Sequence, residues 1–238
     1  MTSQPPKART VAVVLAGGVG SRLGSATPKQ LIELDGKPVM EYAVAAFQAA
    51  DAIDDIYIVM QPDHVAEAEK IASRYPKVTT VLAGGTTRNG STKAALDELR
   101  DAQRPDAKVL FHDAARPLLA PNIIVDVVDA LDAHEAVSVA IPSADTVFEL
   151  NDHDEVARVP PRSRLRRVQT PQGFRLATIQ QAYDLAWRDP AFDGATDDCS
   201  VVFQYLPNVP IAVVMGSDRN LKITEPGDIV LAERLLHH

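Results

Sequence analysis

The stretch Val11-Ala-Val-Val-Leu-Ala-Gly-Gly-Val-Gly-Ser-Arg-Leu-Gly-Ser-Ala-Thr-Pro-Lys-Gln30 is the most informative part of this chain. It opens with six apolar, largely β-branched residues, a pattern typical of a fully buried strand. Four glycines and two cations follow, at Gly17, Gly18, Gly20, Gly24, Arg22 and Lys29. Glycines let the backbone turn sharply and present N–H groups to phosphate oxygens. The stretch therefore predicts a loop that binds a nucleoside triphosphate.

Three other interpretations of this glycine-rich stretch were weighed. The spacing of Gly18, Gly20 and Gly24 also resembles a dinucleotide-binding turn, but such a turn does not need clustered cations. No Gly-Lys-Ser/Thr sequence closes the stretch, so it is not a Walker loop. A plain strand-to-helix turn with surface cations is the simplest alternative, and it leaves the clustering of Arg22 and Lys29 unexplained.

Composition limits the class of protein. The 238 residues are 46% hydrophobic, which is enough for one large α/β domain. A net charge of −8 argues against a nucleic-acid partner, so an anionic ligand must be held by local cations. The single cysteine, Cys199, permits no intrachain disulfide and favours a reducing compartment. We find no stretch typical of a signal peptide or a membrane span, and we expect a cytoplasmic enzyme with no membrane partner.

Strand and helix patterns alternate along most of the chain. Strands are expected at residues 11–16, 53–60, 78–82, 109–111, 137–141 and 209–215, and helices at 40–50, 65–74, 92–99, 121–133, 176–187 and 228–236. This alternation predicts a single Rossmann-like α/β domain over residues 1–238, with a mostly parallel, doubly wound sheet. Polar loops at residues 17–24, 84–91 and 112–117 each follow a strand. Ligands bind at that edge of such sheets, which predicts one site built from all three loops.

The pattern changes between residues 142 and 168. Two short apolar segments, at residues 145–150 and 155–159, flank a polar turn at residues 151–154. This is typical of a protruding hairpin-like β-arm rather than of another strand-helix unit. Apolar surface on such an arm needs a partner, so we expect a homodimer formed through the arm.

Charged residues near the predicted sheet edge suggest the chemistry. Asp113 ends a strand, and Mg²⁺ prefers one or two carboxylates together with phosphate oxygens. A helix cap or a partner of Arg116 is the alternative role for Asp113. Lys222 lies in a polar gap between a strand and a helix, and His112 is either catalytic or structural. Without a Ser/His/Asp set or zinc spacing, these residues favour phosphoryl or nucleotidyl transfer, which depends on positioning and charge neutralisation.

With these residues placed, the chain resembles the CTP-dependent cytidylyltransferases of sugar-alcohol phosphates. The resemblance runs from about Val11 to Leu235. Six ordered motifs carry it: the glycine-rich loop with Arg22 and Pro28-Lys29-Gln30, Gly84-Gly85 with Arg88 and Ser91, His112-Asp113-Ala-Ala-Arg116-Pro117, Thr170-Pro171-Gln172, Thr196-Asp197-Asp198, and Asn220-Leu-Lys222-Ile-Thr224. The resemblance implies a nucleotide-diphospho-sugar transferase fold.

The resemblance also implies a role for individual residues. Arg22, Lys29 and Lys222 would be catalytic, stabilising charge at the α-phosphorus of CTP, and Asp113 would bind Mg²⁺. The nucleotide would be bound by Leu15, Ala16, Gly17, Gly18, Gly20, Gly84, Gly85, Arg88, Ser91 and Ala114, with Ser91 near the cytosine. The polyol phosphate would be bound by Arg116, Thr146, Arg162, Thr170 and Thr196. The arm residues Thr146 and Arg162 would act on the other subunit.

Two substrates are open within this family. Ribitol 5-phosphate, which is used in teichoic acid or cell-wall polysaccharide synthesis, is favoured by the residues found in several motifs. These are residues 15–22, 140–146 and 196–202, among others, together with Phe148 and Pro161 on the arm. The alternative is 2-C-methyl-D-erythritol 4-phosphate of the non-mevalonate isoprenoid pathway, with which residues 114–116 and 172–174 agree better. More distant alternatives are an NAD(P)-dependent reductase and a CTP sensor without turnover.

Overall fold

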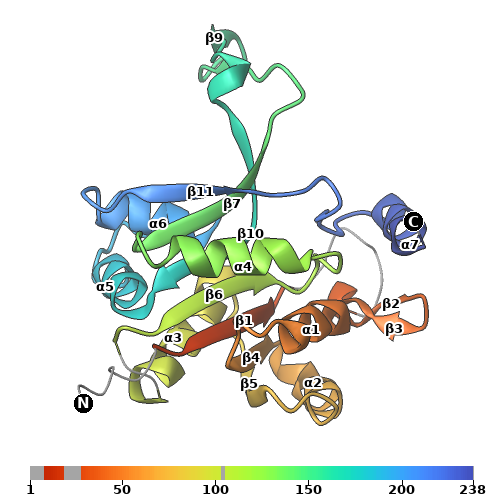
Figure 1. The fold of residues 1–238 in the computed structure, drawn as a ribbon. Coiled ribbons are helices and arrows are strands. Elements are labelled where there is room, and N and C mark those ends of the chain that lie inside the picture. Colours follow the sequence, from red (N-terminus) through yellow and green to blue (C-terminus); the bar gives the residue numbers. More distant parts are fainter. Residues whose placement is uncertain (1–7, 19–27, 103–104, 238) are drawn as a thin grey trace.

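A seven-stranded sheet forms the centre of the molecule, seen here in a computed structural model that describes residues 8–18, 28–102 and 105–237 (Figure 1). Its order is β11-β7-β10-β6-β1-β4-β5. The strands are β1 (Thr10–Ala16), β4 (Asp55–Met60), β5 (Val78–Ala83), β6 (Lys108–Asp113), β7 (Ala136–Pro142), β10 (Arg166–Arg175) and β11 (Ile211–Met215). Every strand but β10 runs in one direction, which confirms the mostly parallel sheet.

Helices cover both faces of the sheet. The helices are α1 (Val39–Ala49), α2 (Val65–Ala72), α3 (Arg88–Ala102), α4 (Pro121–Ala130), α5 (Leu176–Ala186), α6 (Asp198–Tyr205) and α7 (Pro226–Leu236). Side chains alternate across β1: Ala12 and Val14 pack into a core with α1, α2 and α4, whereas Val11 and Val13 pack into a core with α3, α5 and α6. This is the doubly wound arrangement that the buried first strand predicts.

Short elements close the edge of the molecule near α1 and α7. The 3₁₀ helix η2 (Lys29–Leu31) precedes the small hairpin of β2 (Glu33–Leu34) and β3 (Lys37–Pro38), and η3 (Pro62–His64) leads into α2. Leu34 of β2, Ile223 and Ala232 of α7 share a third, smaller core. No helix in the described part of the chain has the length and apolar character needed to cross a membrane.

Strand β10 was not expected from the sequence. It runs antiparallel between β6 and β7, and its pairing with β7 shifts register between Gln169 and Gln172. Pro171, which follows a cis peptide bond, lies at this irregularity. Proline donates no hydrogen bond to a ladder and polar residues flank it, so the pattern of an interior strand was absent.

Two further differences concern helices near the site. Helix α6 was not predicted, because its first residues read as a polar loop motif. Helix α3 begins at Arg88 instead of residue 92, so Arg88 and Ser91 lie in its first turn and not in an open loop. Both helices therefore bring their N-terminal ends to the carboxyl edge of the sheet.

The expected arm leaves the sheet between Pro142 of β7 and Arg166 of β10, and it projects well beyond the rest of the molecule (Figure 1). It contains β8 (Glu149–Leu150), β9 (Val156–Arg158) and the 3₁₀ helix η4 (Arg162–Arg164). The paired strands are shorter than predicted. Large apolar side chains are exposed along it, at Val147, Phe148, Leu150, Val156 and Val159.

Gly173 of β10 lies directly under helix α4. A Cβ atom built on Gly173 would be 2.6 Å from Cγ1 of Val127 and 3.0 Å from Cδ1 of Leu131. We expect Gly173→Ala to lower the free energy of unfolding by about 1–3 kcal/mol, because a well-packed core must shift to take the methyl group. Urea unfolding at neutral pH measures this. Gly227→Ala in α7 is the control, since nothing lies within 4 Å of its added Cβ, and an equal loss in both variants would contradict the explanation.

Candidate active site

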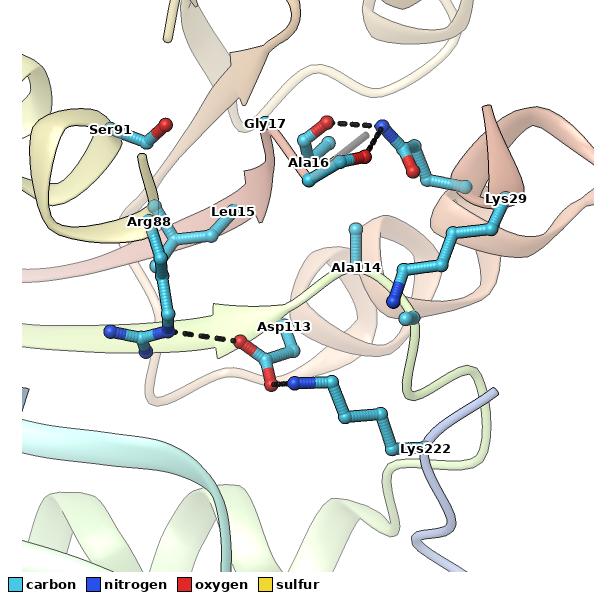
Figure 2. A pocket seen from close by; sticks show the side chains of 12 residues that line it. Leu15, Ala16, Gly17, Lys29, Arg88, Ser91, Asp113, Ala114 and Lys222 are labelled. Atoms are coloured by element: carbon cyan, nitrogen blue, oxygen red, sulfur yellow. Dashed lines mark hydrogen bonds and ion pairs between the residues drawn. The ribbon is translucent and has the colours of Figure 1, made fainter. Parts of the chain in front are cut away.

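The three polar loops meet at the carboxyl edge of the sheet, where they form a pocket (Figure 2). Ten of the residues predicted from the sequence line it: Leu15, Ala16, Gly17, Gly18, Lys29, Arg88, Ser91, Asp113, Ala114 and Lys222. Gln30 and Ala115, which were not predicted, complete the lining. Hydrogen bonds hold the loops together, for the Ala114 N–H donates to the Leu15 carbonyl at 3.0 Å.

Asp113 is the centre of charge in this pocket. Its Oδ2 lies 2.7 Å from Nζ of Lys222, and its Oδ1 lies 3.5 Å from Nε of Arg88 (Figure 2). Burial disfavours the charged carboxylate, but the Arg88 and Lys222 charges outweigh burial and hold the pKa of Asp113 well below its ordinary value. Asp113 therefore remains an anion at any physiological pH.

Lys222 is brought to Asp113 by the backbone of its own segment. The Ile223 N–H donates to the Ala115 carbonyl at 2.8 Å, and the Asn220 carbonyl accepts from Nη1 of Arg116 at 2.7 Å. The Asn220 side chain also donates to the Thr170 carbonyl at 2.8 Å. These contacts explain why asparagine and lysine stand two residues apart in this segment.

Lys29 is positioned through its neighbour Gln30. The Gln30 side-chain amide is buried, and it donates to the carbonyl of Ala16 and, at 3.2 Å, to that of Gly18. These bonds tie helix η2 to the end of β1, so that Lys29 extends into the pocket (Figure 2). Gln30 therefore positions η2, a role with no sequence signal beyond its place next to a predicted catalytic residue.

The glycines allow a close approach around Ser91. A Cβ on Gly17 would lie 2.4 Å from Oγ of Ser91, and a Cβ on Gly84 would lie 2.7 Å from the same atom. A Cβ on Gly85 would meet the backbone of Gly90 at 2.8 Å. Gly84 and Gly85 thus shape the turn into α3 without lining the pocket, while Ser91 faces it.

A second cavity adjoins the first and shares Arg88, Asp113 and Lys222 with it. Three predicted substrate-binding residues line this second cavity: Arg116, Thr170 and Thr196. Gln172 and Asp197 also line it. The molecule therefore offers two adjoining cavities that meet at one carboxylate and its cations.

The two predicted residues of the arm line neither cavity. Thr146 and Arg162 lie on the arm, where both are exposed, and Nη1 of Arg162 donates to the Ala144 carbonyl at 3.0 Å. Gly20 and Arg22 lie outside the described residues. The two cavities of a single chain are therefore lined by the predicted lysines Lys29 and Lys222, but by neither predicted arm residue.

His112 is a structural residue in this arrangement. It is fully buried, with Nδ1 3.0 Å from Oγ1 of Thr170 and Nε2 3.1 Å from the Arg116 carbonyl. Burial lowers the pKa of His112 to about 4, so the ring is neutral at pH 7. Its two ring nitrogens are engaged in linking Thr170 to Arg116, which leaves neither of them to act as a base.

The buried His112 predicts a loss of stability in mild acid. Between pH 6.5 and pH 4 the unfolded chain binds a proton at this residue and the folded chain does not, so stability falls as the pH falls. We expect about 2 kcal/mol of the unfolding free energy to be lost between pH 7 and pH 5 through His112. Urea unfolding of wild type and His112→Gln at both pH values isolates the contribution of His112 to the pH dependence of the unfolding free energy. An identical pH dependence in the two proteins would contradict it.

Comparison with known proteins agrees with this geometry. The family described as IspD, 2-C-methyl-D-erythritol 4-phosphate cytidylyltransferase, matches residues 10–238. A protein of that description from Thermobifida fusca is 48% identical over 234 residues, covering 96% of this chain and 93% of the relative. A bifunctional ribulose 5-phosphate reductase/CDP-ribitol pyrophosphorylase from Haemophilus influenzae is 39% identical, covering 96% of this chain but 48% of that protein.

A solved structure supports the same conclusion. The crystal structure of 4-diphosphocytidyl-2C-methyl-D-erythritol synthase from Anaerococcus prevotii superimposes with a TM-score of 0.84 at 29% identity, covering 97% of this chain and 99% of the other. A cytidylyltransferase of this family uses CTP and a sugar phosphate as its substrates. The chain belongs to the 2-C-methyl-D-erythritol 4-phosphate cytidylyltransferase (IspD) family and is a CTP-dependent nucleotidyltransferase.

Proposed function

We propose that this enzyme transfers CMP from CTP to 2-C-methyl-D-erythritol 4-phosphate and releases pyrophosphate, as a step of isoprenoid biosynthesis in the cytoplasm. The observation that carries the choice of substrate is the 48% identity, over nearly the whole chain, to a relative of that description. The relative that forms CDP-ribitol is 39% identical, and the present chain spans about half of its length.

This choice reverses the preference for ribitol 5-phosphate drawn from the motif wording. Two of the details behind that preference, Phe148 and Pro161, lie on the arm and line neither cavity of this chain. Others, such as Ala140, are buried positions of β7, where the residue type is determined by packing in the core.

The first cavity is proposed to bind CTP. Gly17 and Gly18 present backbone to the phosphates, and Ser91 lies beside the base. Lys29 and Lys222 enter the same cavity, and their charges would stabilise the negative charge that gathers at the α-phosphorus. Arg22, which lies outside the described residues, is proposed for the same role on the basis of the sequence.

The second cavity is proposed to bind the polyol phosphate. Arg116, Thr170 and Thr196 line it, and it opens onto Asp113 and Lys222, where the two substrates would meet. The phosphate of the second substrate is the nucleophile, and it is ionised near neutral pH. No general base is needed, in agreement with the neutral and fully engaged His112.

Asp113 fits a magnesium ion whose other ligands are phosphate oxygens and water. It is held in the anionic form, and it faces both cavities. The described residues contain no cluster of three or more His, Cys, Asp or Glu side chains suited to a metal, and Asp113 is the carboxylate that we assign to Mg²⁺. Mg²⁺ bound there would neutralise the charge of the CTP phosphates.

The arm is proposed to join two subunits. Phe148 is 56% exposed, and Leu150 and Val156 are about as open to solvent in the single chain. Apolar side chains on a projecting arm are typical of surfaces covered by a partner. A dimer of this kind would also allow Thr146 and Arg162 to approach the second cavity of the other subunit.

An assay of pyrophosphate release tests the proposed reaction. Purified enzyme with CTP and Mg²⁺ should release pyrophosphate with 2-C-methyl-D-erythritol 4-phosphate, and much more slowly with D-ribitol 5-phosphate. Lys222→Ala should reduce kcat at least about a hundredfold, because a transition-state charge contact is lost. Faster release with ribitol 5-phosphate, or none with either substrate, would refute the proposal.

The proposed dimer should be weakened by a single charge placed on the apolar surface of the arm. Phe148→Asp should shift the protein from dimer to monomer in light scattering after gel filtration, because a carboxylate would be buried at the interface without a partner. Phe203→Asp is the control, since Phe203 is 74% exposed on α6, away from the arm. A monomeric wild type, or equal effects of the two variants, would show that the arm does not join subunits.

A further inference from the structure

Two residues that line the second cavity each carry a buried hydrogen-bond donor that has no partner among the described residues. Nη1 of Arg88 and Nε2 of Gln172 are both buried, and neither has a hydrogen-bond partner among the described residues. Both side chains line the second cavity. Buried donors are nearly always paired in folded proteins, so two orphaned donors at one cavity indicate a place where a ligand supplies the acceptor.

The orientation of the Gln172 amide is fixed by helix α6. Its Oε1 accepts from the backbone N–H groups of Asp198 at 3.0 Å and of Cys199 at 3.1 Å, in the first turn of that helix. The side chain is completely buried. Because the oxygen is held by two donors, the nitrogen is necessarily the free end, and it can only donate.

The side chain of Arg88 is fixed by Asp198, whose backbone N–H also binds the Gln172 amide. Nη2 of Arg88 donates to Oδ2 of Asp198 at 2.9 Å, while its Nε faces Asp113. Asp198 is itself fully buried, and its Oδ1 accepts from the hydroxyl groups of Thr92 at 2.9 Å and Tyr183 at 2.7 Å. Asp198 therefore orients Arg88 with its side chain and Gln172 with its backbone.

We propose that Arg88 Nη1 and Gln172 Nε2 act as a donor pair that binds the phosphate of the second substrate, and that Asp198 is the positioning residue for both. A phosphate monoester is the ligand that this wall fits, because both atoms only donate and one carries positive charge. Arg116, which lines the same cavity, supplies a third buried donor, its Nε, that has no partner in the described part of the chain.

This assignment rests on the proposed function and deepens it. Asp113 and Lys222 line the same cavity, and they also line the first cavity, which is proposed to bind CTP. A phosphate held by Arg88 and Gln172 would thus be next to the site where CTP places its α-phosphorus. Arg88 lines both cavities, so one guanidinium would hold the nucleophile beside the nucleotide instead of serving the nucleotide alone.

Three variants separate ligand binding from support of the fold. Gln172→Met removes the donor and the helix contact, whereas Gln172→Glu keeps an oxygen for the α6 N–H groups and replaces the donor with an acceptor. Gln48→Met is the matched control, because Oε1 of Gln48 also accepts a backbone N–H, that of Lys77 at 2.9 Å, and Gln48 lies outside both cavities. Steady-state KM values for each substrate and the thermal midpoint are measured for all three.

We expect Gln172→Met and Gln172→Glu to raise the KM for 2-C-methyl-D-erythritol 4-phosphate about tenfold or more, with the KM for CTP changed less than twofold. Gln48→Met should keep both KM values. If the polyol KM in Gln172→Glu equals that of wild type, or if both KM values rise together, the donor pair is refuted. Wild type that turns over neither polyol phosphate refutes the proposed function instead.

Inorganic phosphate distinguishes the phosphate from the hydroxyl groups of the substrate. It should inhibit wild type competitively against the polyol phosphate, and the inhibition constant should rise in Gln172→Glu by a factor similar to that of the KM. An unchanged inhibition constant would show that the pair does not bind phosphate. Asp198→Asn, which weakens the hold on Arg88, should raise the polyol KM in the same sense, and an unchanged value would refute its positioning role.

Discussion

The carboxylate of Asp113, held between Lys222 and Arg88 at the end of β6, is the interaction on which the site depends. It draws three segments that are distant in the sequence to one point of the sheet edge. A buried carboxylate without these cations would be costly, and two cations without the carboxylate would repel each other. The arrangement keeps Asp113 charged and places two cations at the boundary of both cavities.

A second buried carboxylate, Asp198, extends this charge arrangement into the core. Arg88 lies between Asp113 and Asp198, and the two carboxylates raise the pKa of its guanidinium against the effect of burial. Tyr183 donates to Asp198, and burial together with the Asp198 charge raises the pKa of Tyr183 well above its ordinary value, so it remains a donor. The position of Arg88 is consequently set by α6 and α5, which are far from Arg88 in the sequence.

The sequence predicts the fold class and the first cavity well, because both rest on local patterns. A buried β-branched run followed by glycines indicates a strand and its loop, and strands of one direction bring their loops to one edge. The antiparallel β10 was missed because Pro171 and Gln172 interrupt its apolar pattern. Gln172 and Asp198 stand in two of the recognised motifs but received no individual role, because the roles proposed for them depend on an unpaired atom and on a contact with Arg88 110 residues away. Such properties have no local signature.

The choice between the two polyol substrates also lies beyond what a comparison of motifs can decide. Motif wording compares residues by position, whereas selectivity depends on which atoms face the polyol. Arg116, Thr170 and Gln172 line the second cavity, and the partners proposed for them are groups that any polyol phosphate carries. Under this proposal, selection between methylerythritol and ribitol would come from the shape of the cavity and from what the arm of a second subunit adds to it. The exposed Thr146 and Arg162 are the side chains with which this chain would make that addition.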